Sequence, residues 1–312
     1  MMAPFVRAPL LDILAHLDAQ LAAGAAAVTI AVLDPDLGRG RYAGERVEID
    51  GASYVHRPFR LWVDLAERRG LRLRTPRPGT PPLIELTFEP LARAAELGAQ
   101  VRASGDDRTE WYGAASPFAR ISKLEEPGFL LDMADALGRI ALPPGARVLD
   151  LGVNTGDELA LLLALVPALR AGTLVGVDHS ASALAVCRDR LPGVQLHQAD
   201  LGALGSLGLG RFDLVLSIGT LQSPGVDDRV VLRQLVQDHL TPRGAVILGF
   251  PNCRYIDGEI EHGTRMKNFR QPELGLLIKD IAFYRKYLQQ HDRQVFVTGN
   301  QYLLVTGVAA AR

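Results

Sequence analysis

Short apolar runs alternate with longer amphipathic segments along the second half of the chain. The runs carry Val, Leu and Ile at most positions, which is typical of strands that are buried on both faces. The predicted strands are 146–152, 173–178, 194–200, 211–219 and 244–250, and the predicted helices are 157–170, 181–191 and 229–240. This alternation predicts an α/β domain with a doubly wound, mostly parallel sheet.

The end of the chain predicts a change of strand direction. A helix over 280–291 precedes two strand-like runs, 293–299 and 301–309, which are separated by Asn300. Two strands so close in sequence pair as a hairpin, so one of them runs antiparallel to the rest. The domain is therefore predicted to contain a seven-stranded sheet with a terminal antiparallel hairpin.

Residues 1–92 show a different pattern, which predicts a smaller accessory α+β domain. Leucines recur at helical spacing in the first 21 residues, and the run VTIAVL predicts a strand over 28–33. A strand near Tyr54, a helix over 61–70 and a strand over 83–91 follow. Residues 93–126 are mixed and polar, which indicates a linker with a short helix, and 127–312 form the second domain.

Composition excludes few functions. Of the 312 residues 48% are apolar, enough for a sizeable core, and a net charge of −1 gives no global attraction to nucleic acid or an anionic membrane. The two cysteines, Cys187 and Cys253, form no disulfide framework and match no zinc spacing, so no metal is expected.

The N-terminal region gives no sign of membrane targeting. Its longest uncharged run, 19–33, is too short to span a bilayer, and polar residues interrupt any signal-like core. We therefore expect a soluble, cytoplasmic protein that does not enter the membrane. The oligomeric state is left open.

The loop after the first strand of the second domain has an unusual sequence. It reads RVLDLGVNTGDE over 147–158, so that Asp150 ends the strand and Gly152, Asn154 and Gly156 alternate after it. Glycine lets a ligand approach the backbone because it has no Cβ. Asparagine tolerates positive φ better than other non-glycine residues, so the loop is expected to keep its shape at Asn154.

Three carboxylates end successive predicted strands, namely Asp150, Asp178 and Asp200. Ligands of open α/β sheets bind beyond the carboxyl ends of the strands. A carboxylate at the end of the second strand is suited to accept hydrogen bonds from both hydroxyls of a ribose. Any one of these acids could instead cap a turn or a helix. The three together favour a nucleoside site.

Two common nucleotide-binding loops do not fit this stretch. A dinucleotide loop requires G-x-G-x-x-G and a P-loop requires Gly-Lys-Ser/Thr, whereas the spacing here is G-x-N-x-G. Asp150 would also face a pyrophosphate or triphosphate with like charge. The acid suits a ligand that carries a cation at that end, such as the ammonium of S-adenosylmethionine.

Five segments, in order, resemble the class I S-adenosylmethionine-dependent methyltransferases. They are VLDLGVNTG, similar to the family's D-x-G-x-G-x-G motif with Asn154 for the middle glycine, then GVDHSASALAVCRDRL, HQADL, FDLVLSIGTL and LTPRGAVIL. The resemblance covers 147–250 well and about 93–312 more loosely. It implies a Rossmann-like transferase whose cofactor is S-adenosyl-L-methionine.

The resemblance also implies where that cofactor binds. Asp178 would bind the ribose, Asp200 the adenine amino group, and the Leu201 amide the adenine ring. The implied cofactor-binding residues are Asp150, Gly152, Asn154, Gly156, Asp178, Asp200, Leu201 and Ser217. From their position before the first strand, four residues within 111–127 are expected to cover the cofactor: Tyr112, Phe118, Arg120 and Lys123.

The acceptor is less determined than the cofactor. Alignment of donor and nucleophile supplies most of the acceleration in methyl transfer, so no fixed catalytic residue is required. The fourth strand ends in Ser217-Ile218-Gly219-Thr220 instead of the Asn/Asp-Pro-Pro-aromatic signature, which argues against a planar amine acceptor. An aminopropyltransferase would need an aspartate there and stays a minor alternative.

Segment 251–270 is too long for a simple turn and is expected to be an acceptor-binding loop. The substrate candidates on it are Tyr255, Glu259, Glu261 and Lys267, and His262 is a candidate base. A solvated loop is the alternative for each. Cys253 lies roughly where RNA cytosine-5 methyltransferases place a nucleophile, but the second-cysteine motif is missing, so we expect a packing thiol.

Two classes of acceptor compete most closely, a small molecule, which is slightly favoured, and RNA. Segment 56–77 holds seven arginines against two acids, together with Phe59 and Trp62, which could stack on bases. Against RNA, the helical spacing of Trp62 and Leu65 favours burial of both in the domain core. A catalytically inactive partner protein is a further alternative, which the three retained strand-end acids disfavour.

Overall fold

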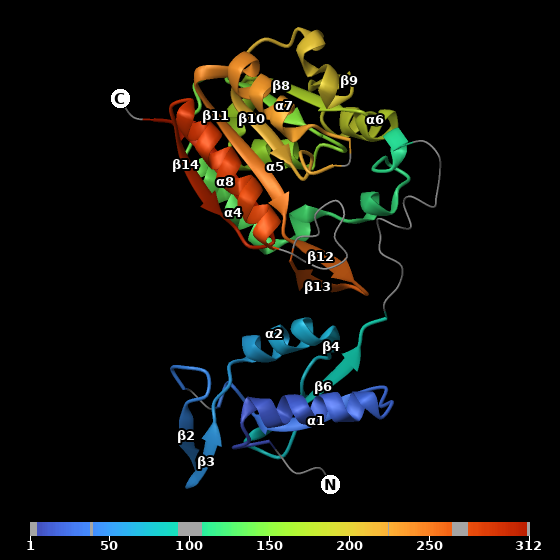
Figure 1. Cartoon of the computed structure of the whole chain (residues 1–312), viewed down its shortest axis with the longest axis vertical. Coiled ribbons are helices and arrows are strands. Elements are labelled where there is room, and N and C mark those ends of the chain that lie inside the picture. The colour runs from blue at the N-terminus through green and yellow to red at the C-terminus, as the bar shows by residue number, and fades with distance from the viewer. Residues whose placement is uncertain (1–4, 38–39, 93–107, 224, 264–273, 311–312) are drawn as a thin grey trace. The chain divides into compact units, whose positions relative to one another are not determined.

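The computed structural model of the chain describes residues 5–37, 40–92, 108–223, 225–263 and 274–310. The chain forms two compact units (Figure 1). The smaller contains Met1–Ala94 together with Tyr255–Glu261, and the larger contains Ala95–Arg254 and His262–Arg312. A piece of the expected acceptor loop is thus grouped with the N-terminal residues.

The larger unit is built on one mixed seven-stranded sheet with the strand order β14-β15-β11-β10-β7-β8-β9. The strands are β7 (Arg147–Leu151), β8 (Thr173–Asp178), β9 (Gln195–Gln198), β10 (Phe212–Ile218), β11 (Leu240–Pro251), β14 (Arg293–Thr298) and β15 (Tyr302–Ala309). Six of them run in one direction, and β15 alone is antiparallel to its neighbours β11 and β14. The α/β class is confirmed.

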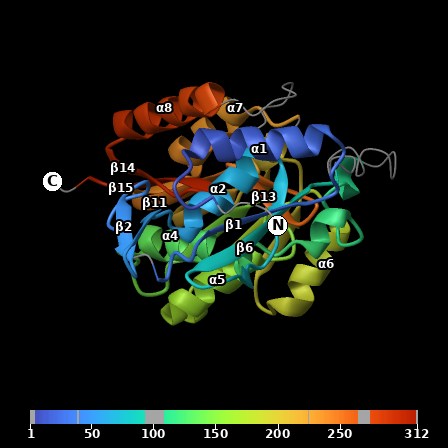
Figure 2. The same cartoon turned by 90° about the horizontal axis from the view of Figure 1, so that it is seen from below.

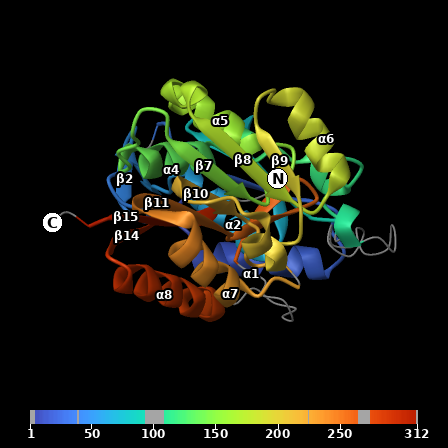
Figure 3. The same ribbon diagram turned by 90° about the horizontal axis from the view of Figure 1, so that it is seen from above.

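Helices cover both faces of this sheet (Figures 2 and 3). One face carries α4 (Pro127–Gly138), α5 (Asp157–Leu165) and α6 (Ala181–Arg190), and the other carries α7 (Asp228–Gln234) and α8 (Leu274–Gln290). Phe129, Met133 and Leu159 pack with Cys187 on the first side. Cys187 is fully buried, and burial raises the pKa of its thiol to about 11.

Two predicted helices end earlier than expected. The helix predicted over 157–170 stops at Leu165, because Pro167 pushes Val166 out of the helical region to φ −130° and ψ 74°. A 3₁₀ turn, η4 (Pro167–Ala171), follows. The helix predicted over 229–240 changes after Gln234 into a π turn, η6 (Leu235–His239), from which β11 continues directly.

Short 3₁₀ turns lead into and out of the core strands. Before α4 the chain forms η1 (Arg108–Glu110), η2 (Pro117–Arg120) and η3 (Lys123–Glu125), and η5 (Leu201–Leu207) follows Asp200. In the described part of the predicted linker, no α-helix forms, and the residues after Ser116 make a 3₁₀ turn that begins at Pro117.

The smaller unit packs α1 (Leu10–Ala22) and α2 (Phe59–Arg69) around an antiparallel sheet. The sheet contains β1 (Val28–Leu33), β6 (Leu83–Pro90), β4 (Leu71–Leu73) and the short β5 (Arg77–Pro78), and β2 (Arg46–Ile49) forms a separate hairpin with β3 (Ala52–Val55). Ile13, Leu17 and Trp62 are fully buried in its core, whereas Leu11 of the predicted leucine stripe is 74% exposed.

The prediction that segment 251–270 is a loop is wrong in one respect, because residues 253–262 form a β-hairpin. Strands β12 (Cys253–Ile256) and β13 (Glu259–His262) pair through Asp257 and Gly258, which have φ of 49° and 82°. A two-residue turn with positive φ at both positions favours an Asp-Gly pair. Lys267 lies outside the described residues.

Within the described part of the chain, we find no helix with the length and hydropathy that crossing a membrane requires.

Candidate functional site

The loop between β7 and α5 has the left-handed backbone that its sequence predicts. Gly152, Asn154 and Gly156 have φ of 79°, 45° and 89°. The Asn154 side chain stabilises the bend, since its Oδ1 accepts a hydrogen bond from the Thr155 amide at 2.8 Å. Its Nδ2 donates to the Tyr112 carbonyl at 2.7 Å, which fixes the preceding segment against the loop. The prediction of positive φ at Asn154 is confirmed.

The two glycines of the loop are also required by the protein's own packing. A Cβ on Gly152 would lie 2.0 Å from Thr220 Oγ1, and one on Gly156 would lie 2.8 Å from Cys187 Sγ. Sequence reasoning explained these glycines by the approach of a ligand. The structure adds a second cause, the close contact of the loop with neighbouring side chains.

Asp178 at the end of β8 is buried and fixed by two backbone amides. Its Oδ2 accepts a hydrogen bond from the Asn154 amide and its Oδ1 one from the Ser180 amide, each at 2.9 Å. The cap of α6 is supplied by Ser180, whose Oγ accepts from the Ala183 amide at 3.1 Å. A carboxylate oxygen can accept more than one hydrogen bond, so Asp178 keeps capacity for ligand hydroxyls.

Asp200 has a different environment. It is exposed, and its Oδ1 accepts a hydrogen bond from the Gly202 amide at 2.7 Å, which caps η5. The capping alternative therefore accounts for one of its oxygens. Leu201, beside it, is almost completely buried.

Asp150 at the end of β7 is fully buried, and no described residue donates a hydrogen bond to either of its carboxylate oxygens. Burial and then the nearby Glu158 carboxylate raise the pKa of Asp150 well above its usual range, which the Lys123 ammonium opposes. On the adjacent strand β10, the buried Ser217 hydroxyl is likewise without a partner in the described chain. Buried polar groups of this kind are uncommon and often mark a ligand site.

A buried acid that sequence reasoning missed lies close to Asp150. Glu158, in the first turn of α5, has 1% of its side chain exposed and accepts a hydrogen bond from Lys123. Burial alone would lower the pKa of Lys123, but the negative charge of Glu158 raises it above its ordinary value. Two buried acids thus lie near one lysine, and the cationic end of a ligand would favour the ionised form of Asp150.

The segment before α4 is fixed to the start of α6. The Glu110 carboxylate accepts hydrogen bonds from the hydroxyls of Ser180 and Ser182, and these bonds, Ser182 first, lower the pKa of Glu110. The ring centroids of Tyr112 and Phe118 lie 5.0 Å apart. Of the four residues expected to cover the cofactor, Lys123 is placed beside Asp150, while Arg120 is exposed.

Sequence reasoning missed Glu110, Ser180 and Ser182 as well as Glu158. The one signal was the Ser-x-Ser pair at the start of a predicted helix, where serine is a common cap. Nothing in the sequence indicated that a carboxylate 70 residues earlier would bond both hydroxyls.

The acceptor-side candidates lie on hairpin β12–β13. Tyr255 is 41% exposed, and the Glu259 carboxylate forms an ion pair with Arg72 Nε at 3.2 Å. Glu261 and His262 are half-buried on β13. Cys253 is half-buried at the start of β12, and no second cysteine adjoins it, because Cys187 is in the core.

Most of the arginine-rich segment 56–77 is engaged within the protein. Arg57 is buried and donates to the Ala8 carbonyl, and four other arginines form ion pairs: Arg60 with Asp64, Arg69 with Asp18, Arg72 with Asp257 and Glu259, and Arg74 with Glu89. Trp62 is fully buried, so its predicted place in the core is confirmed. These contacts reduce the positive charge and aromatic surface available to RNA.

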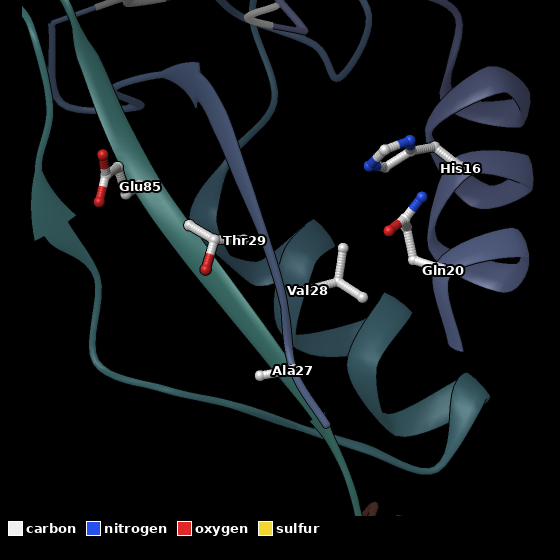
Figure 4. A pocket seen from close by; sticks show the side chains of 6 residues that line it. All are labelled: His16, Gln20, Ala27, Val28, Thr29 and Glu85. Carbon is white, nitrogen blue, oxygen red and sulfur yellow. The ribbon is translucent and has the colours of Figure 1, made fainter. Parts of the chain in front are cut away.

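The smaller unit also contains a depression of about 600 Å³ lined by residues of α1, β1 and β6 (Figure 4). His16 and Gln20 project from α1 on the same side as Val28, whereas Thr29 and Glu85 lie on the strands. Neighbouring strand residues point to opposite faces of a sheet, so the depression wraps around the edge of β1 and is not an enclosed cavity.

Comparison with known proteins identifies the domain that carries the strand-end acids. Residues 148–244 match the family model described as a methyltransferase domain. Trans-aconitate 2-methyltransferase of Azoarcus sp. (strain BH72) is 35% identical over 117 residues, which are 38% of this chain and 44% of that protein.

Two further relatives match at similar identity. The enzyme of the same name from Paracidovorax citrulli is 30% identical over 151 residues, 48% of this chain and 55% of that protein. A carboxy-S-adenosyl-L-methionine synthase of Methylococcus capsulatus is 37% identical over 125 residues, 37% of this chain and 49% of that protein. The chain thus spans about half the length of the curated relatives it matches. The residues that match the methyltransferase-domain model lie in the larger unit, and they include the glycine loop and the strands β8, β9 and β10.

Proposed function

We propose that this protein is an S-adenosylmethionine-dependent methyltransferase that acts on a small-molecule acceptor. The observation that carries the proposal is the Asp178 carboxylate, buried at the end of β8 and bonded to the amide of Asn154 in the glycine loop. This hydrogen bond fixes the Asp178 carboxylate, which would accept hydrogen bonds from a ribose, against the glycine loop.

The other residues of the site fit the cofactor chemically. Asp150 and Glu158 are two buried acids near one lysine, and a bound ammonium group would favour the ionised form of Asp150 that burial opposes. The unpartnered Ser217 hydroxyl adds a donor or acceptor at the same edge of the sheet. Asp200 and the Leu201 amide are proposed to contact the adenine.

When bound, the cofactor supplies a methyl group on a positively charged sulfur. This protein's own residues then have to bind, orient and shield the reacting groups, because the displacement needs no fixed catalytic residue. We assign His262 on β13 as the candidate base for acceptors that must lose a proton, and Tyr255 and Glu261 as acceptor contacts.

The choice of acceptor class rests on two observations. Two of the three relatives named above are, by name, methyltransferases of a small molecule, and five of the arginines that would serve RNA are engaged in internal contacts. Trans-aconitate is therefore the first compound to test. RNA stays the alternative, which would bind with an affinity that falls steeply as salt rises.

Calorimetry with S-adenosylhomocysteine tests the cofactor site. Loss of a buried charge-assisted hydrogen bond costs about 1.5–3 kcal/mol, so Asp178→Ala should weaken binding roughly 10- to 150-fold. Asp200→Ala is the matched control, since the same change at an exposed strand end should weaken binding less. An Asp178→Ala protein that binds as tightly as wild type, or a wild type that does not bind, would contradict the proposal.

A transfer assay tests the reaction. Methyl-labelled S-adenosylmethionine is incubated with trans-aconitate, and separately with a small-molecule extract and with total tRNA. Label in a small molecule supports the proposed acceptor class, and label only in RNA would overturn it.

A further inference from the structure

Hairpin β12–β13 begins at the edge of the sheet where the strand-end acids lie. Strand β11 runs parallel to β10, which runs parallel to β7, so Pro251 ends β11 at the same edge as Asp150 ends β7. β12 begins two residues later at Cys253. Ligands of such sheets bind outside this edge, so the chain enters β12 from the ligand-binding edge of the larger unit.

The tip of the hairpin groups with the smaller unit. Residues Tyr255–Glu261 belong to that unit, whereas Arg254 and His262 belong to the larger one. The chain therefore leaves the larger unit for seven residues and then returns to it. Such an arrangement requires contacts that hold the tip.

Arg72 on β4 supplies those contacts with a single guanidinium group. Its Nη2 lies 3.1 Å from Asp257 Oδ2 and its Nε lies 3.2 Å from Glu259 Oε1, so the two acids on either side of Gly258 share one arginine. Nη2 also donates to the Asp257 carbonyl, and the Ala92 amide donates to Asp257 Oδ2 at 3.2 Å. The side chains of this cluster are 34% to 43% exposed, so they are partly shielded from solvent.

Arg72 is itself firmly placed. It pairs in register with Glu89 in the β4–β6 ladder, and β4 directly follows α2, whose Trp62 is fully buried. The planar guanidinium can bond two carboxylates and a carbonyl at once, which a lysine ammonium cannot do in the same geometry.

We propose that Arg72 is a positioning residue that fixes the tip of hairpin β12–β13, so that the N-terminal unit sets the conformation of the acceptor-side segment. The effect on methyl transfer rests on the proposed function, but the fixing of the hairpin does not. The N-terminal unit then acts on acceptor selection through Arg72, which contacts the hairpin and touches neither cofactor nor acceptor.

Hydrogen exchange of the peptide that spans 251–263 tests this directly. Arg72→Ala should speed exchange of the hairpin amides roughly 5- to 30-fold, because the tip opens more often. Arg74→Ala is the matched control, since Arg74 lies two residues away and pairs with Glu89 at 2.7 Å. It should leave hairpin exchange unchanged. Equal exchange in Arg72→Ala and wild type, or equal acceleration in the two variants, would overturn the proposal.

Reversing the charges of the ion pair distinguishes a specific contact of Arg72 from a general loss of stability. Arg72→Glu should accelerate hairpin exchange, and adding Glu259→Arg should restore most of the protection, because the ion pair re-forms with its charges reversed. Arg72→Lys should give an intermediate rate. A double variant that exchanges no more slowly than Arg72→Glu alone would contradict a specific contact.

Binding and transfer assays separate this proposal from the proposed function. Arg72→Ala should keep its affinity for S-adenosylhomocysteine within about twofold and should raise KM for trans-aconitate more than it lowers kcat. If wild type neither binds the cofactor product nor methylates trans-aconitate, the proposed function fails, while hairpin exchange still decides the role of Arg72. A normal KM in Arg72→Ala, with a loosened hairpin, would overturn the link to acceptor selection.

Discussion

The glycine loop after β7 and the turn of hairpin β12–β13 use the same backbone device in opposite surroundings. Each has a glycine of similar positive φ, 79° at Gly152 and 82° at Gly258. A Cβ on Gly152 would strike Thr220, whereas a Cβ on Gly258 would meet no heavy atom of the described residues within 4 Å. At position 152 glycine is therefore required by the positive φ and by the nearby Thr220 side chain. At position 258 only the positive φ requires it.

The two segments also differ in what holds them. The glycine loop is fixed by contacts of Asn154 with Tyr112 and Asp178, all within the larger unit. The hairpin turn is fixed by Arg72, which is 185 positions away in the sequence. The candidate cofactor site thus rests on its own unit, while the candidate acceptor segment depends on a second one.

The largest effect is expected for Gly152→Ala. The new Cβ would lie 2.0 Å from Thr220 Oγ1 at a backbone conformation that alanine disfavours, so a loss of about 3 kcal/mol or more is expected. Chemical denaturation should show it, together with loss of S-adenosylhomocysteine binding. Adding Thr220→Ala should restore part of the stability, and a double variant no more stable than Gly152→Ala would show that crowding is not the cause.

A smaller effect of opposite sign is expected for Asp150→Asn. Because burial raises the pKa of Asp150, ionising this carboxyl costs more free energy in the folded protein than in the unfolded chain. Replacement should raise the stability of the protein without cofactor by about 1 kcal/mol, or roughly 2–4 °C in Tm, while weakening cofactor binding.

The stability gained by Asp150→Asn should depend on pH. Below about pH 4, the ordinary pKa of an aspartate, the carboxyl is protonated in both the folded and the unfolded state, and the variant should gain little. As the pH rises, the unfolded chain ionises first, so wild type loses stability relative to the variant. Asp178→Asn serves as a contrast and should destabilise at neutral pH, because an NH2 group replaces one of the two oxygens that each accept from a backbone amide. A stability gain that shrinks between pH 4 and pH 7 would contradict the assignment.

The smallest effect is expected for Gly258→Ala. With open space around the Cβ, only the left-handed conformation opposes it, at a cost of roughly 1–2 kcal/mol that falls mainly on local opening of the hairpin. Global stability should change little, and hydrogen exchange over 251–263 should rise. If Gly258→Ala cost as much global stability as Gly152→Ala, the comparison between the two segments would be wrong.

Local sequence predicted the elements in which one force dominates. Apolar runs set the strands of the sheet, because a strand buried on both faces needs them, and Pro167 could have marked the helix end at Leu165. Positive φ at Asn154 followed from the residue type alone. The Asp257-Gly258 pair between two strand-like runs was an available hairpin signal that the sequence interpretation overlooked.

Tertiary structure decided what depends on distant partners. The sequence predicted Asp150 as a ligand-binding acid, but nothing in it indicated Glu158. Only the folded chain buries both acids near Lys123, and this burial raises the pKa of Asp150. In the sequence Arg72 is one of seven arginines of a basic segment, and only the structure shows that it pairs with Asp257 and Glu259 of the hairpin. The sequence by itself determined where the chain bends and which residues seek burial, because those preferences are local. It could not determine which charges meet, because a charge's energy depends on neighbours that only the folded chain brings within a few ångströms.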